Sequence, residues 1–237
     1  MTRKIAYTIK DRDKTISDRK TYQRKTYLRK AYHEAGHAVM AVHMGLHLGD
    51  VSTPTGGVGL SLVPDKTRGT VECYSGARTN VSIIPVWSVF SELPECLAKG
   101  YSQEQFVRFR QDEVECFAMV SLAGEAAQRL FSPRGFRKVH IASDYAKANK
   151  YMGKVFLDDG AKERRIAELK QIVRNIVAIR WPIITEVAQL LFDCKELGAI
   201  EAEELITKRF DEQYAKDPAL ENRINGTGWS GELGFSS

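Results

Sequence analysis

Residues 31–39 read AYHEAGHAV, and the interpretation of the whole chain starts from this stretch. The segment 17–46 around it gains apolar residues towards its C-terminal half and predicts a helix that ends near Gly45. On a helix, His33 and His37 are four residues apart, so their side chains project from one face about one turn from each other. Two imidazoles at that separation can bind one Zn²⁺ ion in roughly tetrahedral geometry.

Glu34 completes the HExxH pattern. It lies ~100° around the helix from His33, close enough to act on water at the metal but poorly placed to bind the metal itself. A metal ion lowers the pKa of a bound water towards ~7, and a carboxylate outside the ligand set can then remove the proton. The small residues Ala35 and Gly36 leave room for substrate or backbone to come close. The pattern therefore predicts a zinc-dependent hydrolase, against the alternative of two ordinary histidines on a helix.

Outside this helix, the chain is expected to be mainly α with a small β element, an α+β class. Residues 50–64 are rich in β-branched residues, Gly and Pro and predict a strand through Val58–Leu62. Ser102 followed by Gln105 resembles a capping box. Helical periodicity is found in four later segments. The first covers residues 102–131, the second begins near residue 143, the third covers 161–192 with a break at Trp181-Pro182, and the fourth covers 201–214.

The stretch 31–39 resembles the active-site helix of the FtsH-type zinc peptidases, in which AYHEAGHAV is typical. Three further stretches resemble motifs of that family in the same order: 51–64, LAGEAA at 122–127 and ASDYAKA at 142–148. The resemblance covers roughly residues 27–211 and implies a zincin-like FtsH peptidase domain with HExxH on its first long helix. We expect a basic N-terminal arm (1–25), a zinc peptidase domain (26–214) containing an insertion (66–110), and a flexible tail (215–237).

The family's third zinc ligand is the aspartate of its last motif, which corresponds to Asp144. The local sequence agrees, because an N-cap at Ser143 would place Asp144 in the first helical turn, where the helix dipole favours an ionised carboxylate. His140, four residues earlier, and Glu125, where the family usually has Arg, remain alternatives as the third ligand. The implied function is that of a zinc metalloendopeptidase with Glu34 as general base.

The expected substrate is a peptide or an unfolded protein segment. Edge pairing with a strand would hold it in extended form, and the residues expected to do so are Val58, Gly59 and Leu60. The sequence has no phosphate-binding loop of the G-x-x-x-x-G-K-[ST] type, so we expect hydrolysis that is independent of ATP by itself. The resemblance further implies a homo-oligomeric ring and a separate ATPase partner.

Positive charge is concentrated at the N-terminus. Residues 1–30 contain 11 Lys/Arg against three Asp, which accounts for more than the net charge of +5 of the whole chain. Such a segment suits nucleic acid, an anionic lipid surface or an acidic protein. The alternative function is therefore a catalytically silent, FtsH-peptidase-like binding or regulatory protein that acts through this arm. The intact Glu34 argues against it, because a silent protein does not need the base.

Composition excludes several other classes of protein. With 43% hydrophobic residues, the chain has too much apolar material for a wholly disordered protein. No apolar run reaches the ~18 residues that a membrane-spanning helix needs. The four cysteines are widely spaced, without a CxxC pair, which is not typical of a secreted disulfide scaffold. We expect a cytoplasmic protein with no transmembrane segment.

Overall fold

The computed structural model describes residues 9–46, 48, 60–61, 63–64, 71–72, 97–98, 100, 102–133, 141–194 and 196–228. This part of the chain is almost entirely α-helical, so the expectation of a mainly helical protein is confirmed. The helices are α1 (Ile9–His43), α3 (Gln103–Phe131), α4 (Ile141–Met152), α5 (Asp159–Ile179), α6 (Trp181–Cys194), α7 (Ala199–Lys216) and α8 (Leu220–Asn225). The described strands are β1 (Leu60–Ser61), β2 (Val63–Pro64), β3 (Val71–Glu72) and β4 (Glu196–Leu197).

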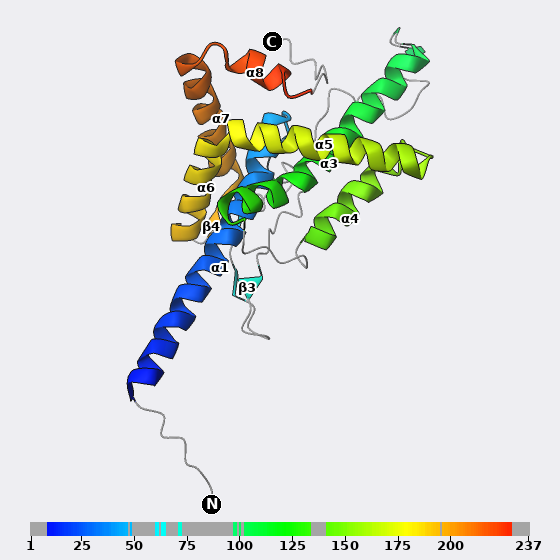
Figure 1. Cartoon of the computed structure of the whole chain (residues 1–237). Helices are drawn as coiled ribbons and strands as arrows, with labels where there is room; N and C mark the ends of the chain where they lie inside the picture. The colour runs from blue at the N-terminus through cyan, green and yellow to red at the C-terminus, as the bar shows by residue number, and fades with distance from the viewer. Residues whose placement is uncertain are drawn as a thin grey trace, which may run out of the picture.

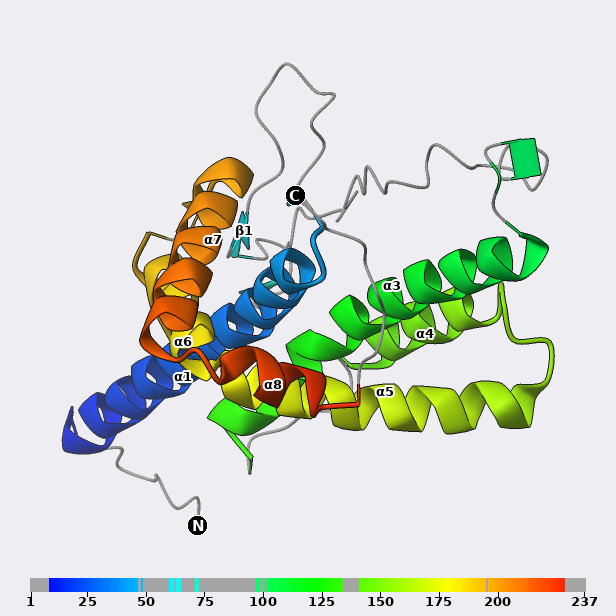
Figure 2. The same cartoon turned by 90° about the horizontal axis from the view of Figure 1, so that it is seen from above.

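Helix α1 is the central element of the fold. It packs against α3 on one side and α6 on the other, while α3 also packs against α4 and α5, and α6 against α7. Figure 2 shows α1 between a layer made of α3, α4 and α5 and the pair α6 and α7. The crossing with α3 is close at Gly36, where an added Cβ would lie 2.7 Å from the carbonyl oxygen of Ala123 and 2.7 Å from Cβ of Ala127. A larger residue at position 36 would push these two helices apart.

An aromatic stack joins α1 to both neighbours. The ring of Tyr32 lies 4.1 Å from that of Phe131 at the end of α3 and 5.2 Å from that of Trp181 at the start of α6, with both pairs stacked. Tyr32 is 8% exposed, so the stack belongs to the core. It fixes α1 one residue before the first histidine of the HExxH pattern.

Local signals explain where several helices begin and end. Ser102 and Gln105 form the predicted capping box, each accepting a hydrogen bond from the other's backbone amide. Asp158 caps α5 by accepting from the amide of Ala161. The predicted break at Trp181-Pro182 is also confirmed, because α5 ends at Ile179 and α6 begins at Trp181.

Within the described residues, none of the helices by itself combines the length and hydropathy of a membrane span; α5 and α6 do so only as a pair bent by 77°.

A buried arginine occupies the junction between α5 and α6. Arg180 is 1% exposed, and its Nη1 donates to the side-chain oxygen of Gln213 on α7 at 2.6 Å. Its Nη2 lies 3.0 Å from the hydroxyl of Tyr214 and 3.4 Å from Nδ1 of His43. The guanidinium also lies 4.0 Å from the ring centroid of Phe210. This cluster connects the C-terminal end of α1 to α7.

A buried ion pair connects α3 to α5. Glu115 is 1% exposed, and its two carboxylate oxygens accept from Nε and Nη2 of Arg165 at 2.8 and 2.6 Å. The pair is bidentate, which is the strong geometry for arginine and a carboxylate.

The strands form two short antiparallel ladders. β1 pairs with β4 through Leu60 opposite Leu197, and β2 pairs with β3 through Val63 opposite Glu72. One edge of β1 is therefore occupied by β4. Leu60, expected to bind substrate, lies in this pair, whereas Val58 and Gly59 lie outside the described residues.

Three boundaries differ from the sequence-based expectations. The first helix already begins at Ile9, so residues 9–25 of the predicted arm continue α1 rather than form a separate segment. α4 begins at Ile141, so Ser143 is its third residue and not its N-cap. The predicted tail contains α8, because Leu220 and Ile224 are buried. Most of the predicted insertion, residues 66–110, lies outside the described residues, but its last eight residues belong to α3.

Candidate metal centre

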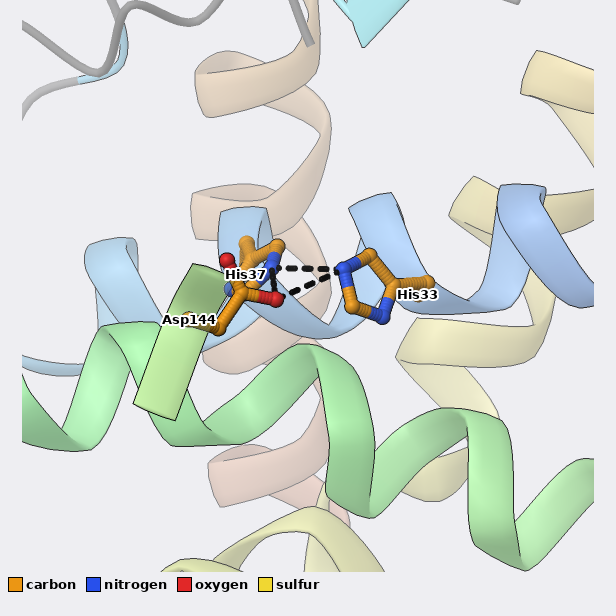
Figure 3. A group of neighbouring side chains, drawn as sticks. All are labelled: His33, His37 and Asp144. Atoms are coloured by element: carbon orange, nitrogen blue, oxygen red, sulfur yellow. Dashed lines mark hydrogen bonds and ion pairs between the residues drawn. The ribbon is translucent and has the colours of Figure 1, made fainter. Parts of the chain in front are cut away.

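Three side chains from two helices converge beside α3. His33 and His37 project from the same face of α1, and Asp144 reaches them from the first turn of α4 (Figure 3). The Nε2 atoms of the two histidines are 3.1 Å apart, and Oδ2 of Asp144 lies 3.1 Å from Nε2 of His33 and 3.6 Å from Nε2 of His37. Within the described part of the chain, this is the group of His, Cys, Asp and Glu side chains that can hold a metal ion.

The distances among the three ligand atoms suit a tetrahedral zinc ion. A triangle with sides of 3.1, 3.1 and 3.6 Å has a circumscribed radius of about 1.9 Å. Three ligands at bond lengths of about 2.0–2.1 Å in ideal tetrahedral geometry form a triangle of almost the same radius. Two imidazoles and a carboxylate also form a common donor set for catalytic zinc, in which a fourth position stays open for water.

A hydrogen bond to α3 sets the tautomer of His37. Nδ1 of His37 lies 2.7 Å from the carbonyl oxygen of Val120, which can only accept, so Nδ1 carries a proton and donates it. In the neutral ring, Nε2 then has a free lone pair directed at the other two ligand atoms. This is the arrangement of a metal-binding histidine whose second nitrogen is held by the protein.

The carboxylate of Asp144 is deprotonated in this environment. Burial raises the pKa of Asp144, but the neighbouring imidazoles of His33 and His37 outweigh burial and hold this pKa far below its usual value. Oδ2 is buried and accepts no well-aligned hydrogen bond from the described residues, although the two imidazole nitrogens are close. Oδ1 lies 3.5 Å from Nζ of Lys147, one turn along α4. The buried oxygen therefore has the free lone pairs that a cation would use.

The pKa of His37 responds to the same charges in the opposite direction. Burial lowers it, but the nearby carboxylate of Asp144, the charge of Glu34 and the hydrogen bond to Val120 together raise it above its ordinary value. A metal ion must displace a proton from such a ring, so binding is expected to weaken as the pH falls.

Glu34 lies next to this group as a buried carboxylate. It is 4% exposed, and its Oε2 is buried with no hydrogen-bond partner among the described residues. A buried polar atom without a hydrogen bond destabilises the fold, so a glutamate in this position is more typical of a functional residue than of a structural one. The side chains of His33 and His37 are 12% and 15% exposed, so the two imidazoles are not completely enclosed by the protein.

The alternative third ligands are Glu125 and His140. Glu125 accepts a hydrogen bond from Nε of Arg129 at 2.7 Å on α3 and does not belong to the converging group. His140 lies outside the described residues. Glu125 is thus separated from the site, while Asp144 is brought to it.

Sequence reasoning missed the contribution of α3. Val120 holds Nδ1 of His37, and Gly124 lies so close to the two imidazoles that an added Cβ would be 2.4 Å from Nε2 of His37. In the sequence, the stretch 122–127 is distinguished only by its resemblance to a family motif. No local signal marks Val120, because a backbone carbonyl is available at every position of the chain.

Comparisons with protein-family models, curated proteins and solved structures gave no match to this chain.

Proposed function

We propose that the protein is a zinc-dependent metallopeptidase that hydrolyses peptide bonds. His33, His37 and Asp144 would hold the zinc ion, and Glu34 would be the general base. The observation that carries this proposal is the convergence of three ligand atoms at zinc-compatible distances, next to the buried carboxylate of Glu34, whose Oε2 has no hydrogen-bond partner among the described residues.

The division of roles follows from the chemistry of the side chains. A zinc ion supplies a water acidic enough to be deprotonated near neutral pH. Glu34 takes that proton from the attacking water and later delivers it to the leaving amine, as a carboxylate near a metal but outside its ligand set can do. Its Oε2 makes no hydrogen bond within the described part of the chain and can accept the proton. Val120 keeps the proton of His37 on Nδ1, so Nε2 stays available as a ligand.

The family resemblance supports the same proposal at a finer level. Stretches 31–39, 122–127 and 142–148 are far apart in the sequence, and they lie on α1, α3 and α4, which meet at the candidate metal centre. We therefore propose a zincin-like FtsH-type peptidase domain acting on peptides or unfolded segments in the cytoplasm. A homo-oligomeric ring, a separate ATPase partner and substrate pairing near Val58, Gly59 and Leu60 form part of that proposal.

The experiment that tests this function is a comparison of the parent with Glu34→Gln. Both are loaded with one equivalent of zinc and incubated with an unfolded protein and a mixture of peptides, and new amino termini are detected by mass spectrometry. The parent should cleave and lose activity with a zinc chelator, while the variant should bind zinc equally well and cleave at least 100-fold more slowly. Equal cleavage by both proteins would contradict the assignment of Glu34.

One observation favours a second candidate function. Figure 1 shows the N-terminal half of α1 extending beyond the other helices, and residues 9–25 of this half contain seven Lys/Arg and three Asp. A positive helix in this position suits docking to an anionic surface. Binding to nucleic acid or anionic vesicles that weakens with salt and is lost on deletion of residues 1–25, without any cleavage by the parent, would favour this second function.

A further inference from the structure

Helix α3 contacts His37 at two points, one turn apart. The carbonyl of Val120 accepts from Nδ1 of His37 at 2.7 Å. Gly124, four residues later, lies where an added Cβ would be 2.4 Å from Nε2 and 2.6 Å from Cε1 of the same ring. The same Cβ would lie 2.8 Å from Cε1 of His33. The two imidazoles therefore occupy the space that any side chain at position 124 would need.

The His37 ring cannot move aside without losing its other contact. A Cβ at 2.4 Å from a ring nitrogen is far inside van der Waals contact, so either the ring or α3 must shift. Rotation of the ring breaks the hydrogen bond to Val120, which fixes the tautomer. Translation of the ring changes the 3.6 Å separation between its Nε2 and Oδ2 of Asp144, on which the ligand geometry depends.

We propose that Gly124 is a positioning residue of the metal centre: its missing side chain allows His33 and His37 to bring their Nε2 atoms together at the surface of α3. This inference rests on the proposed zinc site, but not on peptidase activity. Gly124 acts by leaving space for the ligands, while Val120 orients one of them.

Gly36 provides a comparison in which glycine serves helix packing. A Cβ there would meet the carbonyl oxygen of Ala123 and Cβ of Ala127, both at 2.7 Å, so its close contacts across the helix crossing are with α3 itself. The cost of Gly36→Ala should therefore be the same whether or not the histidines are present. The cost of Gly124→Ala should depend on them.

The first test measures zinc affinity by competition with a chromophoric chelator. Gly124→Ala should weaken zinc binding at least tenfold, as is typical of changes around the ligands of a zinc site. Gly160→Ala is the matched control, because its Cβ would lie on α5 with its nearest neighbours at 3.4 and 3.5 Å on exposed side chains. It should bind zinc like the parent. A parent without zinc affinity, or a Gly124→Ala variant with the parent's affinity, would overturn the proposal.

The second test separates this role from a general packing defect. In metal-free protein, Gly124→Ala should lower the melting temperature by several degrees when both histidines are present. In a His33→Ala/His37→Ala background, the same substitution should leave the melting temperature unchanged or raise it. Gly36→Ala should lower it equally in both. If Gly124→Ala lowers the melting temperature only in the histidine-containing background, the proposal is supported. If it lowers the melting temperature equally in both backgrounds, the proposal is overturned. A protein that binds zinc but cleaves nothing would refute the proposed function and leave this role of Gly124 intact.

Discussion

The half-buried imidazole of His43 leads to a quantitative prediction about stability in mild acid. Burial, followed by the charge of Arg180, lowers the pKa of His43 from 6.5 to about 3. Nδ1 of His43 faces Nη2 of Arg180 at 3.4 Å, so it has the role of an acceptor and the folded protein keeps the ring neutral. The unfolded chain takes up a proton below pH ~6.5, but the folded protein does not do so until about pH 3.

The sign of the effect follows from this difference. Between these two pKa values the unfolded state binds one proton more than the folded state, so stability falls as the pH falls. The slope approaches ~1.4 kcal/mol per pH unit, and the loss between pH 8 and pH 5 attributable to this one group is about 2 kcal/mol. His43→Asn retains an oxygen near the position of Nδ1 but cannot take up the proton.

The measurement is urea unfolding of metal-free parent and His43→Asn at pH 8, 7, 6 and 5. The parent should lose about 2 kcal/mol more than the variant over this range, because other titrating groups contribute equally to both proteins. Parallel losses in the two proteins would show that His43 is protonated in the folded state and that the account of its environment is wrong.

Three further predictions concern the metal centre and the core. Zinc at 100 times its dissociation constant should stabilise the parent by ~2.7 kcal/mol, which corresponds to a rise of about 5–10 °C in melting temperature measured by calorimetry. Zinc should also slow amide exchange in α4, measured by hydrogen exchange. Asp144→Asn should show neither effect. Tyr32→Ala removes the ring stacked on Phe131 and Trp181 and should cost ~3–5 kcal/mol in urea unfolding, whereas Tyr32→Phe should cost under ~1.5 kcal/mol. Arg165→Ala leaves the buried carboxylate of Glu115 without its cation and should lower the free energy of unfolding by ~3 kcal/mol. Adding Glu115→Leu to the same chain should restore most of this stability. An unchanged unfolding midpoint for Arg165→Ala would contradict the prediction.

Those parts of the fold that depend on local sequence could be predicted. The capping box at Ser102, the break at Trp181 and the helical periodicity around them act within one or two turns, and the structure shows them where they were expected. The N-terminal extent of α1 could not be predicted in this way, because residues 9–16 are highly charged and have no apolar periodicity. α8 was not predicted either, because six residues, Leu220–Asn225, are too few to show a helical period, although Leu220 and Ile224 are buried in the structure.

The residues of the candidate site can also be divided into those that local sequence predicts and those that depend on tertiary packing. The i, i+4 spacing of His33 and His37 is a property of one helix, so the sequence is sufficient to place them together. Asp144 is more than 100 residues away in the sequence, and its position was expected through family resemblance rather than through spacing. The roles of Val120 and Gly124 depend on how α3 crosses α1, which is a property of tertiary packing and leaves no signal within either segment.

The most direct test of the central claim is the zinc content of the purified protein after exposure to one equivalent of zinc and gel filtration. We expect one zinc ion per chain in the parent and less than a tenth of that in His37→Ala. His43→Asn is the control, because position 43 lies on the same helix but outside the metal group, and it should also bind one zinc ion per chain. Equal zinc content in the parent and in His37→Ala, or no bound zinc in any of the three, would contradict the claim that His33, His37 and Asp144 form a zinc centre.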